Sequence, residues 1–233
     1  MGRDCIAVAL DVSTLEEAKR LAGAVAPHVG VLKVGLELFV RYGTSAVEAI
    51  APFGVPIFLD LKLHDIPETV GRSVASARDL GVRFLTIHAS GGPAMLRAAA
   101  NAAGDQLRLL GVTVLTSISP DDLRSIGVSA PVDEHARSLA RACHDAGVTG
   151  LVTSALEAPV LRRELPSSFL VTPGIRPSGA ARGDQSRVAT PGDAVRAGAD
   201  LLVVGRPIRD AADPAAAARA IADEVDAALA ERA

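Results

Sequence analysis

Short hydrophobic runs alternate with amphipathic stretches along the whole chain. Each run is rich in Val, Ile and Leu, has the length of a strand, and is followed by a segment with the apolar spacing of a helix. Continuous apolar runs are typical of parallel strands that are buried on both faces. The pattern predicts eight strands, at residues 6–10, 31–34, 58–62, 84–88, 109–115, 150–152, 169–171 and 201–204.

The stretches between these strands predict helices. Ser13 or Thr14 is expected to cap the first helix, because Glu16 and Glu17 follow in its first turn, where the helix dipole favours negative charge. The connection 173–191 is different, since it is long and lacks apolar periodicity, and a loop of that length is usually functional. Further helices are predicted at 36–50, 67–80, 91–103, 133–146, 155–164 and 214–230.

Eight strands that each precede a helix are what a (β/α)8 TIM barrel requires, and 233 residues fit one such domain, residues 1–233. An open doubly wound sheet is the alternative. We favour the barrel because polar residues end nearly every strand, and a barrel gathers all strand ends around one mouth. These residues are Asp11, Lys33, Asp60, Lys62, His88, Thr116, Ser154, Thr172 and Arg206.

The composition narrows the class of protein. A net charge of −3 argues against a nucleic-acid partner, and 3% aromatic residues without Trp argue against a base-stacking surface. The sequence has no signal-peptide pattern and no apolar run long enough for a membrane span, so we expect a cytoplasmic protein. Cys5 and Cys143 fall in separate core elements and are expected to be buried fillers rather than a disulfide or a metal site.

Charge enters the third predicted strand, which should be buried. Asp60 and Lys62 are two residues apart and project to the same face, Asp65 follows after three more residues, and Pro67 marks the first turn of the next helix. Burying such charges is costly unless they are paired. A salt-bridged strand end would need one pair; the third charge favours a preassembled array that holds a protonated Lys62 against a reacting atom.

The end of the last strand has the features of a phosphate site. Gly205 lets the backbone approach a ligand closely, and Arg206 supplies a planar fork suited to phosphate oxygens. Barrels frequently hold phosphate with the loops after the seventh and eighth strands. Arg176 and Gln185 in the long loop are expected to close over the phosphate.

These motifs together resemble the orotidine 5′-phosphate decarboxylases. Asp-Leu-Lys-Leu-His-Asp at 60–65 is similar to the family's Asp-x-Lys-x-x-Asp signature. Seven further motifs before and after it occur in the same order as in the family, around Asp11, Lys33, His88, Thr116, Arg176, Gln185 and Arg206. The resemblance implies loss of carbon dioxide from orotidine 5′-phosphate to give uridine 5′-phosphate, the last step of de novo pyrimidine synthesis. It also implies that no metal or organic cofactor takes part.

The resemblance assigns roles to residues. It makes Lys62 the proton donor and Asp60, Asp65 and Lys33 its catalytic partners, with Asp11 and Lys33 at the ribose. Neighbouring carboxylates are expected to keep Lys62 protonated. The substrate-binding stretch comprises Asp60, Leu61, Lys62, Leu63, His64, Asp65, Ile66, Pro67, Glu68 and Thr69.

Other implied roles concern the base and the partner subunit. A hydroxyl of Thr116 or Ser154, with Ser119 as an alternative, is expected to read the pyrimidine edge. Asp65, Ile66 and Thr69 are expected to reach across the interface of a homodimer into the partner's site. His64 and His88 are interpreted as supporting or core histidines, because no cluster with metal-ligand spacing surrounds them.

Two other functions fit parts of the sequence. A barrel acting on a sugar phosphate through an enediolate, such as a hexulose-phosphate synthase, would require Mg²⁺ and would lose activity with a chelator. A non-catalytic nucleotide-binding barrel would bind its ligand without releasing carbon dioxide. The full charge array argues against a pure binder, which gains nothing from an extra buried carboxylate facing an anionic ligand.

Overall fold

The computed structural model describes residues 1–177 and 188–232. Its strands form a closed barrel in which sequence neighbours pair in parallel and β8 returns to β1. The predicted (β/α)8 TIM barrel is therefore confirmed. The strands are β1 (Ile6–Ala9), β2 (Val31–Gly35), β3 (Ile57–Leu63), β4 (Phe84–His88), β5 (Arg108–Val112), β6 (Gly150–Val152), β7 (Phe169–Thr172) and β8 (Leu201–Val204).

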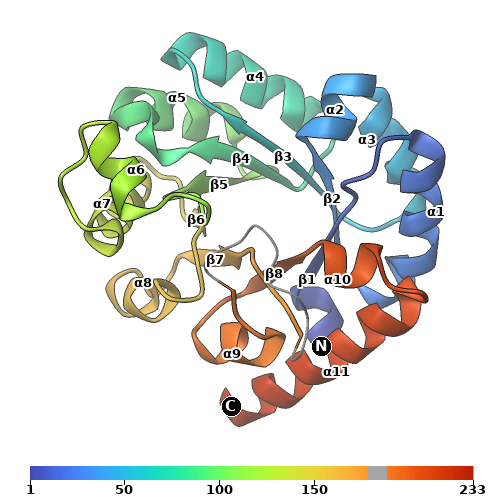
Figure 1. Ribbon diagram of the computed structural model, residues 1–233. Coiled ribbons are helices and arrows are strands. Elements are labelled where there is room, and N and C mark those ends of the chain that lie inside the picture. The colour runs from blue at the N-terminus through green and yellow to red at the C-terminus, as the bar shows by residue number, and fades with distance from the viewer. Residues whose placement is uncertain (178–187, 233) are drawn as a thin grey trace.

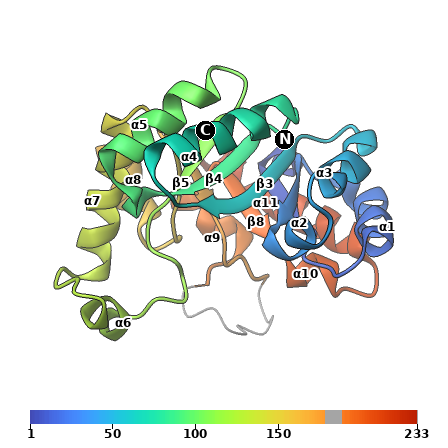
Figure 2. The ribbon, with the colours of Figure 1, turned by 90° about the horizontal axis from the view of Figure 1, so that it is seen from above.

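Helices surround the barrel as an outer ring (Figure 1). Two of them, α6 and α10, lie at one end of the barrel (Figure 2). The helices are α1 (Leu15–Val25), α2 (Leu36–Tyr42), α3 (Ser45–Ile50), α4 (Pro67–Asp79), α5 (Gly92–Ala103), α6 (Pro120–Ser125), α7 (Val132–Asp145), α8 (Ala158–Glu164), α9 (Pro191–Arg196), α10 (Arg206–Arg209) and α11 (Pro214–Arg232). The described residues also form short 3₁₀ turns, η1 (Gly2–Cys5), η2 (Ala26–His28), η3 (Ala51–Phe53) and η4 (Ala89–Gly91).

Local signals explain where several elements begin. Thr14 caps α1, because its hydroxyl accepts a hydrogen bond from the Glu17 amide at 3.2 Å, so Thr14 rather than Ser13 is the cap. Pro67 begins α4 as predicted. The predicted helix 36–50 is wrong in one respect: Gly43, with φ of 56°, breaks it into α2 and α3.

Three other expectations need correction. The fifth strand ends at Val112, three residues before the predicted end at 115, and α8 begins at Ala158 rather than at 155. The short helices α6, α9 and α10 were not predicted from the apolar pattern. The long loop 173–191 is closed at its base, where the Arg176 amide donates to the Ala189 carbonyl at 2.9 Å.

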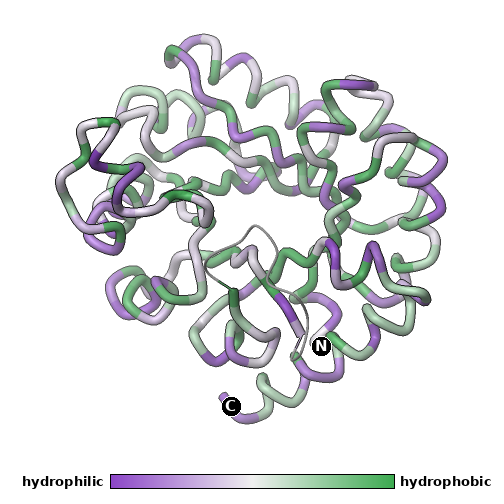
Figure 3. Tube along the Cα trace, in the orientation of Figure 1, coloured by the Kyte–Doolittle hydropathy of each residue, from purple (hydrophilic) through white to green (hydrophobic). Residues whose placement is uncertain are grey.

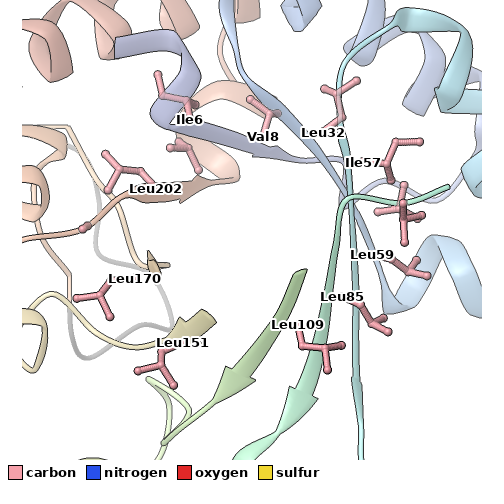
Figure 4. Packing of buried hydrophobic residues seen from close by; sticks show 14 of the residues in the cluster. Ile6, Val8, Leu32, Ile57, Leu59, Leu85, Leu109, Leu151, Leu170 and Leu202 are labelled. Atoms are coloured by element: carbon pink, nitrogen blue, oxygen red, sulfur yellow. The ribbon is translucent and has the colours of Figure 1, made fainter. Parts of the chain in front are cut away.

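Successive side chains of each strand alternate between the barrel interior and the surrounding helices. Hydrophobic residues follow the strands in Figure 3, and Figure 4 shows strand residues directed away from the barrel axis. These form an outer core cluster with the helices, which includes Ile6, Val8, Leu32, Ile57, Leu59, Leu85, Leu109, Leu151, Leu170 and Leu202. The opposite parity builds an inner cluster of Ala7, Val31, Phe58, Phe84, Leu110, Val171 and Leu201.

Aromatic rings fill the lower part of the barrel interior. Phe58 and Phe84 meet edge to face with ring centroids 6.2 Å apart, and Phe84 stacks on Phe169 at 5.8 Å. Burial of Phe58 and Phe84 stabilises the fold by about 1.5–3 kcal/mol for each ring. Because Asp60 and Lys62 have the same parity as Phe58 on β3, they enter the interior above this apolar plug.

Candidate active site

A cavity of about 420 Å³ lies at the carboxyl ends of the strands, and residues from every strand or the loop that follows it contribute to its wall. Its floor is apolar, made by Ala9, Phe58, Val112, Val152 and Val203. Above the floor, polar side chains converge. The structure brings together these residues predicted from the sequence: Asp11, Lys33, Asp60, Lys62, Thr116, Arg176, Gly205 and Arg206.

Four charged side chains form a chain of alternating sign across β1, β2 and β3. Lys33 Nζ lies 3.0 Å from Asp11 Oδ1 and 3.4 Å from Asp60 Oδ2, and Lys62 Nζ lies 2.8 Å from Asp60 Oδ1. Gly35 makes room for this chain, since a Cβ there would stand 2.8 Å from Asp11 Oδ1 and 2.9 Å from Lys33 Nζ. The charges are therefore held in place before any ligand arrives.

Mutual attraction keeps Lys33 and Asp60, the two middle members of this row of charges, ionised. Burial alone would lower the pKa of Lys33, but attraction to Asp60 and Asp11 outweighs it and raises that pKa. Burial would raise the pKa of Asp60, but Lys33 and Lys62, with hydrogen bonds from Lys62 and Thr86, hold it below its ordinary value. At neutral pH Lys33 and Asp60 are thus both charged.

Lys62 has an unusual backbone. Its φ of 52° is the only positive φ of a non-glycine residue in the described part of the chain. It falls where the pairing of β3 with β4 shifts register between Leu59 and Leu63. Such left-handed conformations cost about 1–3 kcal/mol and persist only where the surroundings enforce them. The strain at Lys62 therefore marks a position whose side-chain direction matters.

The rest of the 60–69 stretch lies outside the cavity of its own chain. Leu61 and Leu63 pack against the outer core cluster, as their parity requires. Asp65 is exposed, and its Oδ1 accepts from the Ile66 amide at 2.6 Å. The expectation that Asp65 brackets Lys62 is therefore wrong within one chain, where Lys33 and Asp11 extend the array instead. His64, Ile66, Pro67, Glu68 and Thr69 form an exposed rim.

Three hydroxyl groups were candidates for the pyrimidine edge. Thr116 lines the cavity. Ser119 instead caps α6, exchanging hydrogen bonds with Asp122 in a capping box. Ser154 is buried and its hydroxyl donates to Glu157 Oε2 at 2.5 Å, so it does not line the cavity. Gln185 lies outside the described residues.

Sequence reasoning missed three polar residues of the cavity wall. Thr86, Thr153 and Arg209 all line it. Arg209 donates to the Asp11 carbonyl at 2.9 Å, and its place three residues after Arg206, about one turn along α10, was the available signal. Thr86 lies two residues before His88 and has the same parity on β4. Threonine is common in strands, so this position alone is only a weak signal of a place in the cavity wall.

The two histidines of the candidate stretches contact each other beside the array, with their rings tilted by 39°. The ring centroids of His64 and His88 are 5.6 Å apart. Burial, and then the neighbouring charges of His64 and Lys62, lower the pKa of His88. Among the described residues, no group of three or more His, Cys, Asp or Glu side chains is arranged to hold a metal ion. None of the helices described is both long and apolar enough to span a bilayer.

Comparisons with known proteins agree on one family. Residues 5–221 match the family model described as "Orotidine 5'-phosphate decarboxylase / HUMPS family". An orotidine 5′-phosphate decarboxylase of Anaeromyxobacter sp. (strain K) is 54% identical over 204 residues, covering 87% of this chain and 90% of the relative. That of Thermobifida fusca (strain YX) is 53% identical over 205 residues, covering 87% and 88%. The crystal structure of orotidine 5′-phosphate decarboxylase from Lactobacillus acidophilus superposes with a TM-score of 0.85 at 38% identity, covering 95% of this chain and 98% of that one.

Proposed function

The chain belongs to the orotidine 5′-phosphate decarboxylase / HUMPS family, and from that premise we propose that it converts orotidine 5′-phosphate to uridine 5′-phosphate and carbon dioxide. This is the last step of de novo pyrimidine nucleotide synthesis, and we place the enzyme in the cytoplasm. The observation that carries the proposal is the ion-paired chain of Asp11, Lys33, Asp60 and Lys62 in the barrel's mouth.

Lys62 is the proton donor in this mechanism. The bond between the pyrimidine ring and its carboxylate breaks, carbon dioxide leaves, and the electron pair stays on the ring carbon. The ammonium of Lys62 stabilises that negative charge and transfers a proton to it, and solvent then reprotonates the amine. Its side chain is 28% exposed, which supports access to a ligand, while the contact with Asp60 at 2.8 Å fixes its direction.

Asp60 has two tasks in the proposal. It holds Lys62 in place and keeps the local charge balance, because it faces both ammonium groups. Its fixed negative charge also stands in the same cavity as the substrate carboxylate, and this repulsion is relieved when carbon dioxide leaves as a neutral molecule.

The remaining predicted residues bind the rest of the nucleotide. Asp11 accepts from ribose hydroxyls and Lys33 donates to them. Thr116 reads the pyrimidine edge, which fits its place in the cavity wall. The phosphate is held by Gly205, Arg206, Arg176 and Gln185, and binding energy from this non-reacting group helps to align the charges around the base.

We further propose that the enzyme is a homodimer in which Asp65, Ile66 and Thr69 complete the partner's site. The exposure of these residues outside their own cavity supports this, and Ile66, 65% exposed, is an apolar side chain that an interface would cover. Mixing inactive Lys62→Ala chains with inactive Asp65→Ala chains should restore part of the activity, since one site of each mixed dimer regains both residues. Absence of any recovery, with mixed dimers verified by mass, would count against shared sites.

The decisive experiment follows orotidine 5′-phosphate by its ultraviolet absorbance with purified protein in excess EDTA. We expect absorbance to fall and uridine 5′-phosphate to accumulate. A sugar-phosphate enzyme that needs Mg²⁺ would leave the nucleotide unchanged. A non-catalytic binding barrel would bind the nucleotide without turnover, which a titration with uridine 5′-phosphate would distinguish from a protein with no site.

A further inference from the structure

Thr86 on β4 forms hydrogen bonds with the Lys62 amide and the Asp60 carboxylate of β3, and we propose that it is a positioning residue that sets the direction of the Lys62 ammonium. The inference rests on the proposed function and deepens it. Thr86 is 1% exposed and belongs to the strand next to β3, so it acts from a rigid element rather than from a loop.

The strand pairing explains why Lys62 needs a partner on β4. Leu59 pairs with Leu85 and Leu63 pairs with Ile87, so residues 60, 61 and 62 of β3 stand opposite the single residue Thr86. This two-residue excess interrupts the ladder, and Lys62 takes up the excess with its left-handed φ of 52°. Its amide hydrogen therefore needs an acceptor that the ladder does not provide in that register.

The hydroxyl of Thr86 provides that acceptor and joins it to the charge array. Thr86 Oγ1 accepts from the Lys62 amide at 2.9 Å and donates to Asp60 Oδ1 at 2.8 Å. The same Asp60 Oδ1 receives the Lys62 ammonium at 2.8 Å. A closed ring results, which runs from the Lys62 backbone through Thr86 and Asp60 to the Lys62 side chain.

The hydrogen bonds of this ring indicate that Thr86 positions Lys62 and does not itself donate to the substrate. The single proton of the Thr86 hydroxyl is already donated to Asp60, and one lone pair is taken by Lys62. Removing the hydroxyl would release the backbone and the ammonium of Lys62 together, while Asp11, Lys33 and Arg206 would keep their places around the ligand. A positioning role therefore predicts a loss of kcat with little change in ligand affinity.

A second consequence concerns pH. The hydrogen bond from Thr86 is one of the interactions that hold the pKa of Asp60 low. The other groups facing that carboxylate are Lys33 from β2 and Lys62 on β3 itself, with His88 further along β4. Loss of the hydroxyl should move the acid limb of the kcat/KM profile to higher pH, because Asp60 then protonates more readily.

The test compares Thr86→Val, which keeps the shape and loses the hydroxyl, with Thr86→Ser, which keeps the hydroxyl. Thr113→Val is the matched control, since Thr113 is also a buried threonine, 5% exposed, whose hydroxyl donates only to the Val152 carbonyl, at 3.0 Å, and does not line the cavity. We expect Thr86→Val to lose about 100-fold in kcat, the scale of a misplaced reacting group. We expect its dissociation constant for uridine 5′-phosphate to change by less than about threefold, and Thr86→Ser and Thr113→Val to retain kcat within about threefold.

Three results would overturn the inference: wild-type kcat in Thr86→Val, an equal loss in Thr113→Val at equal melting temperature, or an acid limb that does not move. Should Thr86→Val fail to fold, Thr86→Cys keeps the volume with a weak donor, and its kcat should lie below that of Thr86→Ser and above that of Lys62→Ala. If the unmodified protein does not decarboxylate the nucleotide, the proposed function fails. If it does and Thr86→Val matches it, only the role of Thr86 fails.

Discussion

The ends of β2 and β3 each bring a lysine into the same cavity, but the protein holds the two side chains differently. Lys33 is 7% exposed and lies between two carboxylates, at 3.0 and 3.4 Å, on an ordinary strand backbone. Lys62 is 28% exposed, meets one carboxylate, and has a left-handed φ. The first ammonium is enclosed by its counter-charges, whereas the second is open to the cavity, as the proposed proton donor requires. Pairing and backbone geometry, more than charge itself, distinguish the two lysines.

The largest expected effect is on turnover at the end of β3. Lys62→Ala should lower kcat by at least about ten-thousand-fold, the upper range for a positioned proton donor, with uridine 5′-phosphate still bound. Single-turnover assays and a titration with the product would measure the two quantities. Retained decarboxylation in this variant would remove Lys62 as the donor and end the distinction between the two lysines.

The corresponding change at the end of β2 should lower stability in addition to weakening the proposed ribose contact. Lys33→Met keeps the length of the side chain but leaves Asp11 without its ammonium and Asp60 with only one. We expect the free energy of unfolding to fall by about 3 kcal/mol, as when one partner of a buried pair is removed. Urea denaturation would measure it, with Lys19→Met on α1 as the control for loss of a lysine away from the cavity. A loss no larger than that of the control would mean that Lys33 is not a structural counter-charge.

Arg206, at the proposed phosphate end of the cavity, tests whether phosphate binding helps to align the two lysines. Arg206→Ala should lower kcat/KM by about 3 kcal/mol, the scale of charge-assisted contacts to an anion, while the free energy of unfolding stays near that of the wild type. Adding phosphite to a substrate without its phosphate would show whether the lost contact acts through alignment of the charges. An effect of only a few tenths of a kcal/mol would make Arg206 a bystander.

Asp60 is shared by both lysines, and its ionisation gives a pH test. Its pKa is held below the ordinary value in the folded protein, so its contribution to stability is present above the unfolded pKa of about 3.9. That contribution is lost as the pH falls through the lower folded pKa. The difference in unfolding free energy between wild type and Asp60→Asn should therefore shrink between about pH 4 and pH 2. A difference that grows with acidity would contradict the sign of the shift.

The positions of the charged residues could be predicted from the sequence, because a charged residue in a buried strand is conspicuous. Lys33, Asp60 and Lys62 interrupt apolar runs, and their parity alone places them inside the barrel above Phe58. The eight strands were found for the same reason, although the end of β5 was misplaced because the apolar run continues past Val112 into the loop.

Other features depend on contacts that no local pattern records. Thr86 looks like any strand-forming threonine, and its role exists only through the register shift opposite β3. Asp65 was expected beside Lys62 from spacing, but the start of α4 turns its side chain toward the Ile66 amide. For α6 a signal was present, since Ser119 and Asp122 have the spacing of a capping box, but the helix is too short for an apolar period.

The smallest expected effect concerns the backbone conformations of Lys62 and Lys33, and it is a difference in stability between glycine and alanine variants at each position. Alanine at position 62 keeps the cost of a left-handed φ, about 1–2 kcal/mol, which glycine does not have. Glycine loses about 0.5–1 kcal/mol of this advantage because its unfolded chain is more flexible. Lys62→Gly should therefore be more stable to urea than Lys62→Ala by about 0.5–1 kcal/mol, although both are inactive. The matched pair Lys33→Gly and Lys33→Ala should show the reverse order, since β2 has an ordinary extended backbone in which glycine only weakens the strand. Equal stability of the two variants at position 62 would mean that β3 bulges without strain, and that the direction of the ammonium is set by Asp60 and Thr86 alone.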